Sequence, residues 1–525
     1  MNRTFRTTLI AAASLLVGAA CTDPTVAPKS TINSETVFSE PSAYQAFLAK
    51  LYAGLAVTGQ QGAAGNGDIA GIDEGFSHYL RLYWQMQELP TDEAAISWGD
   101  IGLPELNTQM WSSANPFLNA MYYRIFFQVA MVNQFMRETS DSKLSQRGVS
   151  DALKAEIAQY RAEARFLRAL SYYHGIDLFG AIPLVTENSA IETMPAQATR
   201  AQIFEFIETE LKAIKASLPA SKAGQYGRVD RSGAAMLLAK LYMNAKVYTG
   251  TEKYADAMTQ IQEVIAGGYS LDPNFRRMFS ADNHTSPELI FSVPQDGLNI
   301  QSWGGTTFLV HAGVGGPMNN GDYGIDFGWW GLRTKPEIVA LFPSIGAASP
   351  DARAKYFVPM NQVAIDNIGD FQQGTGSPKY INKTSTGANG SHPTHTDVDF
   401  PMFRLADAYL MYAEAHLRGG GGTAAQALTY VNALRQRAYG NATGNITAAQ
   451  LTLDFVLQER ARELFWEGHR RQDLIRYGRF TGNTYNWSWK GGVKAGKSTD
   501  AFRDLYPLPA SELIANKKLT QNTGY

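Results

Sequence analysis

The sequence predicts a mainly α-helical protein, in which a scaffold of helical hairpins is interrupted by loop-rich segments with minor β structure. A hydrophobic content of 45% with 18% charged residues is typical of a chain that buries a core. Apolar residues recur at helical spacing in three segments, about residues 32–58, 115–270 and 400–480. Gly, Pro, Asn, Asp and Ser are frequent between and after them, in about residues 59–115, 270–400 and 480–525.

The N-terminus has the features of a secretion signal. Two arginines precede a short apolar run and small residues within positions 1–20. The run is shorter than the roughly 20 residues that span a bilayer core. Cys21, the only cysteine, follows directly and resembles the lipid acceptor of a bacterial lipoprotein. We therefore expect 1–20 to be a signal peptide and 21–31 a lipidated tether. An ordinary signal peptide followed by an unused thiol is the alternative.

The net charge of −2 gives no electrostatic reason to expect a nucleic acid or an anionic membrane surface as partner. No apolar run after residue 20 is long enough for a membrane-spanning helix. We expect the body of the chain to be held at a membrane only by its anchor.

Helical periodicity begins near Ser42 and places further helices along the chain. They are expected at about residues 42–55, 115–137, 152–178, 200–217, 232–248, 254–266, 405–438 and 452–477. Pro183 ends the third, since it lacks an N–H donor. The segments 232–266 and 405–438 have the form of helix-turn-helix repeats and loosely resemble tetratricopeptide hairpins. Strand-like runs are short, at 288–293 and 306–310.

Three carboxylates spaced by four, Glu459, Glu463 and Glu467, are expected on one face of the last helix. Such a row suits a metal ion or acid–base chemistry, but four arginines lie beside it, which favours an ion-pair network within the scaffold. His392 and His395 lie in a Pro-containing loop, and we expect no metal there. No nucleophile elbow, phosphate loop or zinc-protease motif is present. A pair of glycosidase carboxylates would leave no sequence pattern.

The tryptophans indicate a binding surface. Trp84 and Trp466 are expected in the core. The others lie in predicted loops: Trp98, Trp111, Trp303, Trp329, Trp330, Trp487 and Trp489. Several stand beside glycine and carboxylate residues, a combination that suits oligosaccharides. The ring packs on the apolar face of a sugar, while polar side chains bond its hydroxyls and glycine permits close approach. Loop tryptophans also anchor loops onto a scaffold, and we expect at least two of these to face a ligand.

Three motifs in order resemble the SusD/RagB family of outer-membrane nutrient-binding lipoproteins. The first is AEARFLRAL at 162–170 with DLFGAIPLV at 177–185. The second is QERARELFWEGHRRQDL at 458–474. The third is LYPLP at 505–509 with NTGY at 522–525. Supporting matches are TDE at 91–93 and LYAGL at 51–55.

The resemblance implies a single SusD-like domain over residues 32–525, anchored by lipid on the outer face of the outer membrane. It also implies a partner, a TonB-dependent β-barrel transporter of the SusC type, to which a captured oligomeric nutrient is delivered. The nutrient is expected to be an oligosaccharide, bound without catalysis or cofactor. A peptide or glycopeptide ligand, a surface glycoside hydrolase and a purely structural repeat adaptor are the alternatives.

The resemblance places the ligand on the loop-rich face, away from the repeats. The expected aromatic ligand-binding residues are Trp98, Trp303, Tyr323, Trp329 and Trp330. The expected polar ones are Arg81, Asp92, Glu93 and Asp100, with Asp322 nearby. For Asp92 and Glu93 a structural role in a turn is the alternative.

Overall fold

The computed structural model describes residues 34–63 and 67–525. The chain divides into two compact units, residues 1–43 and 44–525. The described part of the first unit contains α2 (Ser34–Val37), after which the Ser39 hydroxyl donates to the Thr36 carbonyl at 2.8 Å. The predicted signal peptide, Cys21 and the tether lie outside the described residues.

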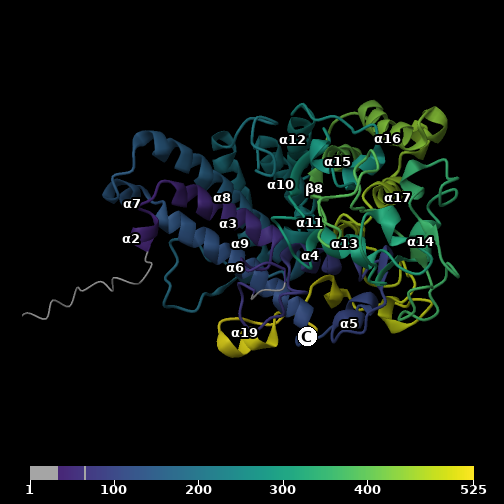
Figure 1. Cartoon of the computed structure of the whole chain (residues 1–525), viewed down its shortest axis with the longest axis horizontal. Helices are drawn as coiled ribbons and strands as arrows, with labels where there is room; N and C mark the ends of the chain where they lie inside the picture. The colour runs from purple at the N-terminus through teal and green to yellow at the C-terminus, as the bar shows by residue number, and fades with distance from the viewer. Residues whose placement is uncertain (1–33, 64–66) are drawn as a thin grey trace, which may run out of the picture. The chain divides into compact units, whose positions relative to one another are not determined.

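Long helices build the first part of the scaffold: α3 (Ser42–Ala56), α6 (Pro116–Glu138), α8 (Asp151–Leu178) and α9 (Arg200–Ile214), which closes in the 3-10 turn η1 (Lys215–Ser217). In Figure 1, α6, α8 and α9 lie side by side, with α8 packed against both. Side chains cap their first turns. Asn115 accepts from the first N–H groups of α6, and Thr199 with Gln202 forms a capping box on α9. The predicted helices in this part of the chain are confirmed.

Two helical hairpins continue the scaffold. The first consists of α10 (Arg231–Met243) and α12 (Tyr254–Ile265), joined through α11 (Ala245–Thr249). The second consists of α15 (Leu405–Leu417) and α16 (Ala424–Tyr439). Within each pair the helices pack on one another, and α12 also packs on α15. Ala235 and Ala239 are completely buried on α10, where small side chains four positions apart permit close approach. The predicted hairpins are therefore present.

Short antiparallel strands connect distant loop-rich segments. The larger sheet has the order β1-β5-β7-β6, from β1 (Ala94–Ile96), β5 (Leu332–Thr334), β7 (Thr375–Gly376) and β6 (Val358–Pro359). Two further pairs are β4 (Leu289–Val293) with β8 (Phe400–Arg404) and β2 (Ile182–Pro183) with β3 (Gln197–Ala198). The predicted strand at 288–293 is confirmed. The β1–β5 register pairs Ile96 with Leu332, which joins two loop-rich segments far apart in the sequence.

Three predictions of secondary structure were wrong. α4 (Tyr79–Glu88) lies in a segment predicted to be loop, and α13 (Gly305–Ala312) replaces the predicted strand at 306–310. Both helices are short and wholly buried, and they follow His78 and Gly304 in place of the Ser, Thr, Asp or Asn that usually marks a helix start. The predicted helix at 452–477 is two helices, α17 (Leu453–Glu463) and α18 (Arg470–Arg476).

The break between α17 and α18 has a local cause. Trp466 and Gly468 adopt left-handed backbone conformations, with φ of 60° and 78°. Buried carboxylates accept the N–H groups that the missing helix turn leaves without partners. Trp466 N–H donates to Glu93 at 2.9 Å, and Gly468 N–H donates to Glu88 at 2.6 Å.

The remaining elements are short. The α-helices are α5 (Leu103–Thr108), α7 (Asp141–Gln146), α14 (Pro336–Val339) and α19 (Ala510–Ala515). The 3-10 turns are η2 (Phe275–Phe279), η3 (Asn283–Thr285), η4 (Asn320–Tyr323), η5 (Ala352–Ala354), η6 (Ala442–Gly444), η7 (Ala448–Gln450), η8 (Lys490–Gly492) and η9 (Ala501–Asp504).

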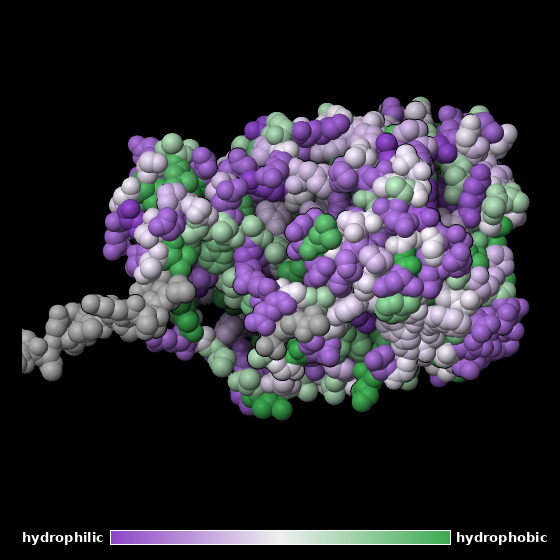
Figure 2. Space-filling model, in the orientation of Figure 1, coloured by the Kyte–Doolittle hydropathy of each residue, from purple (hydrophilic) through white to green (hydrophobic). Residues whose placement is uncertain are grey.

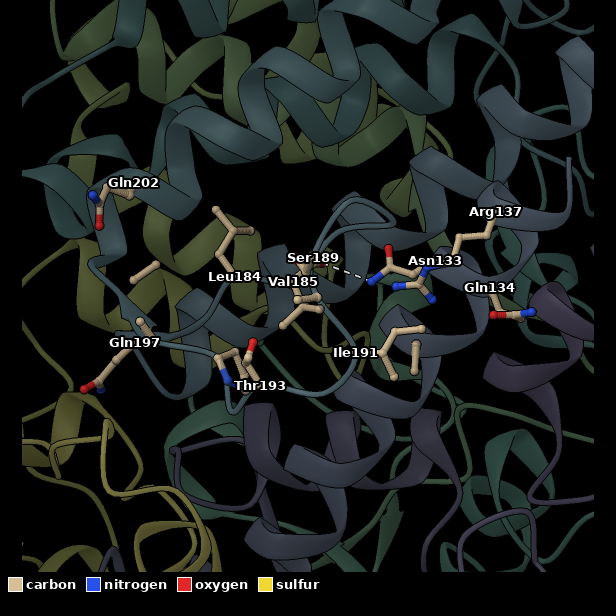
Figure 3. A pocket seen from close by; sticks show the side chains of 15 residues that line it. Asn133, Gln134, Arg137, Leu184, Val185, Ser189, Ile191, Thr193, Gln197 and Gln202 are labelled. Carbon is tan, nitrogen blue, oxygen red and sulfur yellow. Dashed lines mark hydrogen bonds between the residues drawn. The ribbon is translucent and has the colours of Figure 1, made fainter. Parts of the chain in front are cut away.

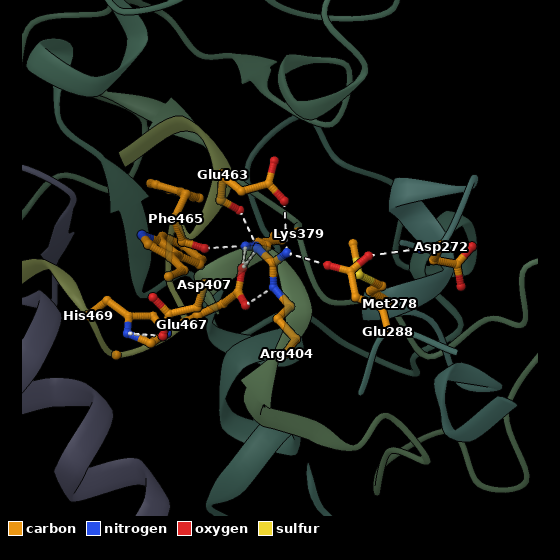
Figure 4. Close-up of polar contacts among 12 residues, drawn as sticks. Asp272, Met278, Glu288, Lys379, Arg404, Asp407, Glu463, Phe465, Glu467 and His469 are labelled. Carbon is orange, nitrogen blue, oxygen red and sulfur yellow. Dashed lines mark hydrogen bonds and ion pairs between the residues drawn. The ribbon is translucent and has the colours of Figure 1, made fainter. Parts of the chain in front are cut away.

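A buried ion-pair network ties the C-terminal helices to the loop-rich segments. Arg404, the last residue of β8, contacts Glu288, Glu463 and Glu467 at 2.6 to 2.8 Å (Figure 4). Glu459 pairs with Arg353 at 2.7 Å. The predicted network is present, although Glu467 lies beyond the end of α17 and so does not share its face. Opposite charges at this distance in the interior replace the water that each group lost on burial.

The face shown in Figure 2 mixes hydrophilic residues with small hydrophobic patches. Among the residues that the structure describes, no helix has both the length and the apolar character needed to cross a bilayer.

Candidate functional site

Three tryptophans from distant segments form an aromatic cluster. The ring centroids of Trp98 and Trp329 lie 6.3 Å apart, and those of Trp303 and Trp329 lie 6.0 Å apart. Each ring is partly exposed. We call Trp98, Trp303 and Trp329 the tryptophan cluster. It brings together three of the residues that the sequence proposed for ligand binding.

The β1–β5 pairing brings together two of the three residues of the tryptophan cluster. Trp98 follows β1 and Trp329 precedes β5, so the antiparallel register carries the two residues toward one another. The pairing extends past the strands, because Ser97 N–H donates to Gly331 O at 2.9 Å and the Trp98 indole N–H donates to Trp329 O at 3.0 Å. Gly331 leaves room for this arrangement. A Cβ at that position would lie 2.7 Å from the Trp98 ring.

Histidine rings pack beside Trp329 and Trp303. His311, on α13, stacks on Trp329 with centroids 4.7 Å apart, and His395 lies 5.0 Å from Trp303. Burial lowers the pKa of both histidines below the ordinary value. The rings are therefore neutral at pH 7 and pack as flat, largely apolar surfaces. His311 Nδ1 also lies 2.7 Å from Phe327 O, which holds the chain leading into Trp329.

Arg81 lies beneath the cluster on α4. Its Nη1 donates to Gly75 O at 2.9 Å and to Trp303 O at 3.2 Å. Its guanidinium carbon lies 5.7 Å from the Trp98 ring centroid, within cation–π distance. Burial lowers the pKa of Arg81 to about 10, and the Asp100 and Asp73 carboxylates partly oppose that shift. Arg81 therefore stays charged at pH 7 and fixes the relative position of two cluster tryptophans.

Trp330 extends the aromatic surface outward. Its side chain is 46% exposed and lies 5.7 Å from the Phe371 ring. Its backbone is left-handed, with φ of 55°, a conformation that costs a bulky residue about 1–3 kcal/mol. Hydrogen bonds from Trp330 N–H to Val314 O and from Ser97 Oγ to Trp330 O maintain it. The fold thus stabilises a strained backbone that keeps a large apolar ring in solvent.

The structure places two predicted ligand-binding carboxylates elsewhere. Asp92 and Glu93 are 1% and 2% exposed, and Asp92 receives two hydrogen bonds from Arg470, at 2.7 and 2.6 Å. Burial raises the pKa of Glu93 to about 8, and its carboxyl accepts from Trp466 N–H. Both groups therefore connect the start of β1 to the α17–α18 break. The prediction that they contact ligand is corrected, because both carboxyl groups accept hydrogen bonds from protein groups and solvent does not reach them.

The other predicted polar groups lie at the surface. Asp100 is exposed near Arg81, and Asp322 is exposed on η4. Tyr323 is half-buried, and its charged neighbours are Arg276 and Asp322. No ring contact between Tyr323 and the tryptophan cluster occurs among the described residues. Asp100 therefore stays a candidate for a hydroxyl contact, whereas Tyr323 does not extend the cluster.

The remaining tryptophans serve packing. Trp84 and Trp466 are completely buried as predicted, with the Trp84 indole donating to Trp466 O at 2.9 Å. Trp111 and Trp487 are 2% and 1% exposed, although they lie in predicted loops. Trp489 donates to Ile365 O at 2.8 Å. These rings anchor loops onto the scaffold.

Sequence reasoning missed two aromatic residues of the site. Phe327 is 49% exposed and lies 6.5 Å from the Trp329 ring, and His311 stacks on that ring. The run Phe327-Gly-Trp-Trp330, with aromatics close to glycine, was a usable signal for the first. His311 had none, because its helix was not predicted.

A pocket of about 1020 Å³ lies apart from the tryptophan cluster (Figure 3). Asn133, Gln134 and Arg137 of α6 line one side, and the 184–202 segment lines the other. None of the lining residues is aromatic or carries a carboxylate. It therefore lacks an aromatic face on which a sugar ring could pack. No group of three or more His, Cys, Asp or Glu side chains suited to a metal occurs within residues 34–63 and 67–525.

Comparison with known proteins gives the family. The family model described as "SusD family" matches residues 351–525, and the model described as "Starch-binding associating with outer membrane" matches residues 83–243. The starch-binding protein SusD of Bacteroides thetaiotaomicron is 34% identical to this chain over 528 residues, which is 92% of each protein.

Solved structures show the same fold. A SusD superfamily protein from Parabacteroides distasonis matches with a TM-score of 0.71 at 22% identity, over 94% of this chain and 100% of that one. Surface glycan-binding protein A from Bacteroides thetaiotaomicron, solved in complex with laminarihexaose, matches with a TM-score of 0.69 at 20% identity, over 91% of this chain and 98% of that one. With its motifs, its helical scaffold and its similarity to SusD along nearly the whole length, this chain belongs to the SusD family.

Proposed function

We propose that this protein binds an oligosaccharide at the cell surface, with a starch-type α-glucan as the first candidate. The tryptophan cluster carries the proposal. Its rings lie about 6 Å apart, so that successive sugars of one chain can each meet an aromatic face. The exposed Asp100 supplies a carboxylate for hydroxyls, and Arg81 holds two of the rings in place. The 34% identity to a starch-binding protein supports the choice of glucan.

Isothermal titration calorimetry of the mature protein tests the ligand class. We expect saturable binding of maltoheptaose, weaker binding of laminarihexaose and none of a neutral peptide of similar length. Trp329→Ala removes roughly 50 Å² of apolar contact, which at about 25 cal/mol/Å² corresponds to about tenfold weaker binding. Trp489→Ala is the matched control, since this half-buried tryptophan lies outside the cluster. Equal affinities for the two variants would contradict the proposal.

The protein acts by binding and not by catalysis in this proposal. Incubation of the pure protein with starch is expected to release no new reducing ends. If reducing ends appear and vanish on substitution of one Asp or Glu, the glycoside hydrolase alternative is correct. Binding of the peptide with no binding of either glucan would favour peptide import.

Delivery to a SusC-type TonB-dependent barrel completes the proposed function, with Cys21 lipidated and the domain facing the exterior. Affinity purification from outer membranes is expected to recover a large β-barrel protein with the chain. Surface labelling of intact cells is expected to modify it. Recovery of the chain without any barrel, or labelling only after lysis, would refute this part.

A further inference from the structure

A second pocket, of about 520 Å³, lies on a different part of the fold from the tryptophan cluster. Residues of η2, η5 and α16 line it, and these elements pack on one another. It shares no lining residue with the cluster. Three cations, Arg276, Lys355 and Arg437, contribute to its wall, and no lining residue is Asp or Glu. The pocket is therefore positive, with no carboxylate of its own.

Arg276 has no acidic partner. Its Nη1 donates to the carbonyl oxygen of Lys379 at 2.9 Å, and no carboxylate lies within ion-pair distance among the described residues. Its guanidinium carbon lies 5.6 Å from the Tyr356 ring centroid. Burial lowers the pKa of Arg276 to about 10, so it remains charged at pH 7. Arg276 is half-buried, and no carboxylate of the protein compensates the partial desolvation of its charge.

Two further donors on the pocket wall lack partners. The Tyr356 side chain is 9% exposed, and its buried hydroxyl has no hydrogen-bond partner in the described chain. The Arg437 Nε is likewise buried without a partner. Native proteins leave few such groups unsatisfied, and a buried donor without an acceptor destabilises the fold. The Arg437 Nε–H can only donate and the tyrosine hydroxyl can donate or accept, and the protein supplies neither of them with an acceptor.

The neighbouring carboxylates do not supply that acceptor. Arg437 pairs with Glu288 at 2.7 Å and also contacts Glu463. Both acids are shared with Arg404, as Figure 4 shows. The exposed Lys355 ammonium has no ion pair among the described residues. The positive charge of the pocket's cations, Arg276, Lys355 and Arg437, therefore exceeds the negative charge that protein carboxylates provide to them.

We propose that this pocket binds an oxyanion, the phosphate, sulfate or carboxylate group of a ligand. Guanidinium and ammonium donors recognise such groups through charge-assisted hydrogen bonds. The volume of about 520 Å³ is many times the volume of about 30 Å³ that one water molecule occupies in the liquid. The pocket therefore accommodates an anionic group attached to a body the size of a monosaccharide.

Calorimetry tests the inference with three probes: inorganic phosphate, sulfate and glucuronate. A chloride salt keeps the ionic strength constant. Saturable binding of at least one probe at millimolar concentration, with none of neutral glucose, is the expected result. Lys355→Gln and Arg276→Gln are each expected to weaken it about fivefold, as for the loss of one charge-assisted donor. Lys517→Gln, at an exposed lysine outside the pocket, is the matched control.

The outcomes separate this site from the proposed glycan site. Trp329→Ala is expected to leave oxyanion binding unchanged, and Lys355→Gln to leave maltoheptaose binding unchanged. The probe that binds identifies the anion chemistry. Absence of saturable binding for all three probes overturns the inference, as does an equal affinity in Lys355→Gln, Arg276→Gln and Lys517→Gln. Circular dichroism of each variant establishes that it is folded, and Lys355→Gln alters only an exposed side chain.

Discussion

Replacement of Gly331 by alanine is expected to disable the tryptophan cluster without removing any of its rings. The new Cβ would lie 2.7 and 2.8 Å from the Trp98 ring, where ordinary contact begins at 3.4 Å. Trp98 is half-buried, so it moves outward and its indole loses the 3.0 Å hydrogen bond to Trp329 O. One lost hydrogen bond costs about 0.5–1.5 kcal/mol. That cost falls on the free and the bound protein alike, whereas the displaced ring no longer meets the sugar, which weakens binding by about tenfold, as for the loss of about 50 Å² of apolar contact.

Gly99→Ala is the matched control for this variant. It lies beside Trp98 in the chain, and a Cβ there meets nothing within 4 Å. Maltoheptaose titrations of both variants, with thermal unfolding of each, decide the matter. We expect Gly99→Ala to match the parent protein and Gly331→Ala to bind weakly with a melting temperature close to that of the parent. Equal affinity of the two variants would refute the assignment of Trp98 to the binding surface.

Other predictions concern stability and anchoring. Glu463→Ala leaves three buried arginines without a shared carboxylate, which should lower the free energy of unfolding by about 3–5 kcal/mol in urea titrations; a loss below about 1 kcal/mol would show that the network relaxes around the gap. Burial alone would raise the pKa of Glu459 and Glu414, but their arginine partners lower both from 4.5 to about 2. Their contribution to stability is therefore present above pH 4.5 and is lost as pH falls toward 2. The free energy of unfolding, measured by fluorescence, should fall steeply in that window. A free energy that does not change between pH 4.5 and 2 would contradict this prediction. Asp92→Asn should destabilise the fold by breaking its contact with Arg470 while leaving the affinity for maltoheptaose unchanged in the folded protein. A weakened affinity in calorimetry would show that Asp92 contacts the glycan. Cys21→Ser should move the protein from the membrane fraction to the soluble one, and continued membrane association on fractionation would refute lipidation at that thiol.

The helical scaffold could be predicted because its signals are local. α6 and α8 expose one side and bury the other, so their apolar residues recur at helical spacing. Capping residues such as Asn115 mark their starts. The same reasoning failed for α4 and α13, which are short and follow His78 and Gly304 in place of a Ser, Thr, Asp or Asn cap, and for the α17–α18 break, which depends on carboxylates from distant segments.

The candidate site could be predicted only in part. The proximity of tryptophans to glycines pointed to Trp98, Trp303 and Trp329, and the structure brings these three rings into one partly exposed cluster. It could not separate them from Trp487, whose loop packs against the scaffold. Asp92 and Arg81 were indistinguishable as polar residues in one segment, yet Asp92 pairs with Arg470 and only Arg81 reaches the cluster.

The sequence by itself determined the class of fold, the order of most helices, the ion-pair role of the Glu459 row and the SusD resemblance, since each is written in contiguous residues. Only the tertiary structure decided which aromatic rings meet and which charges lack partners. The β1–β5 register joins residues 98 and 329, and the oxyanion pocket joins residues 276, 355 and 437. Such meetings depend on the packing of segments far apart in the chain, about which local spacing carries no information.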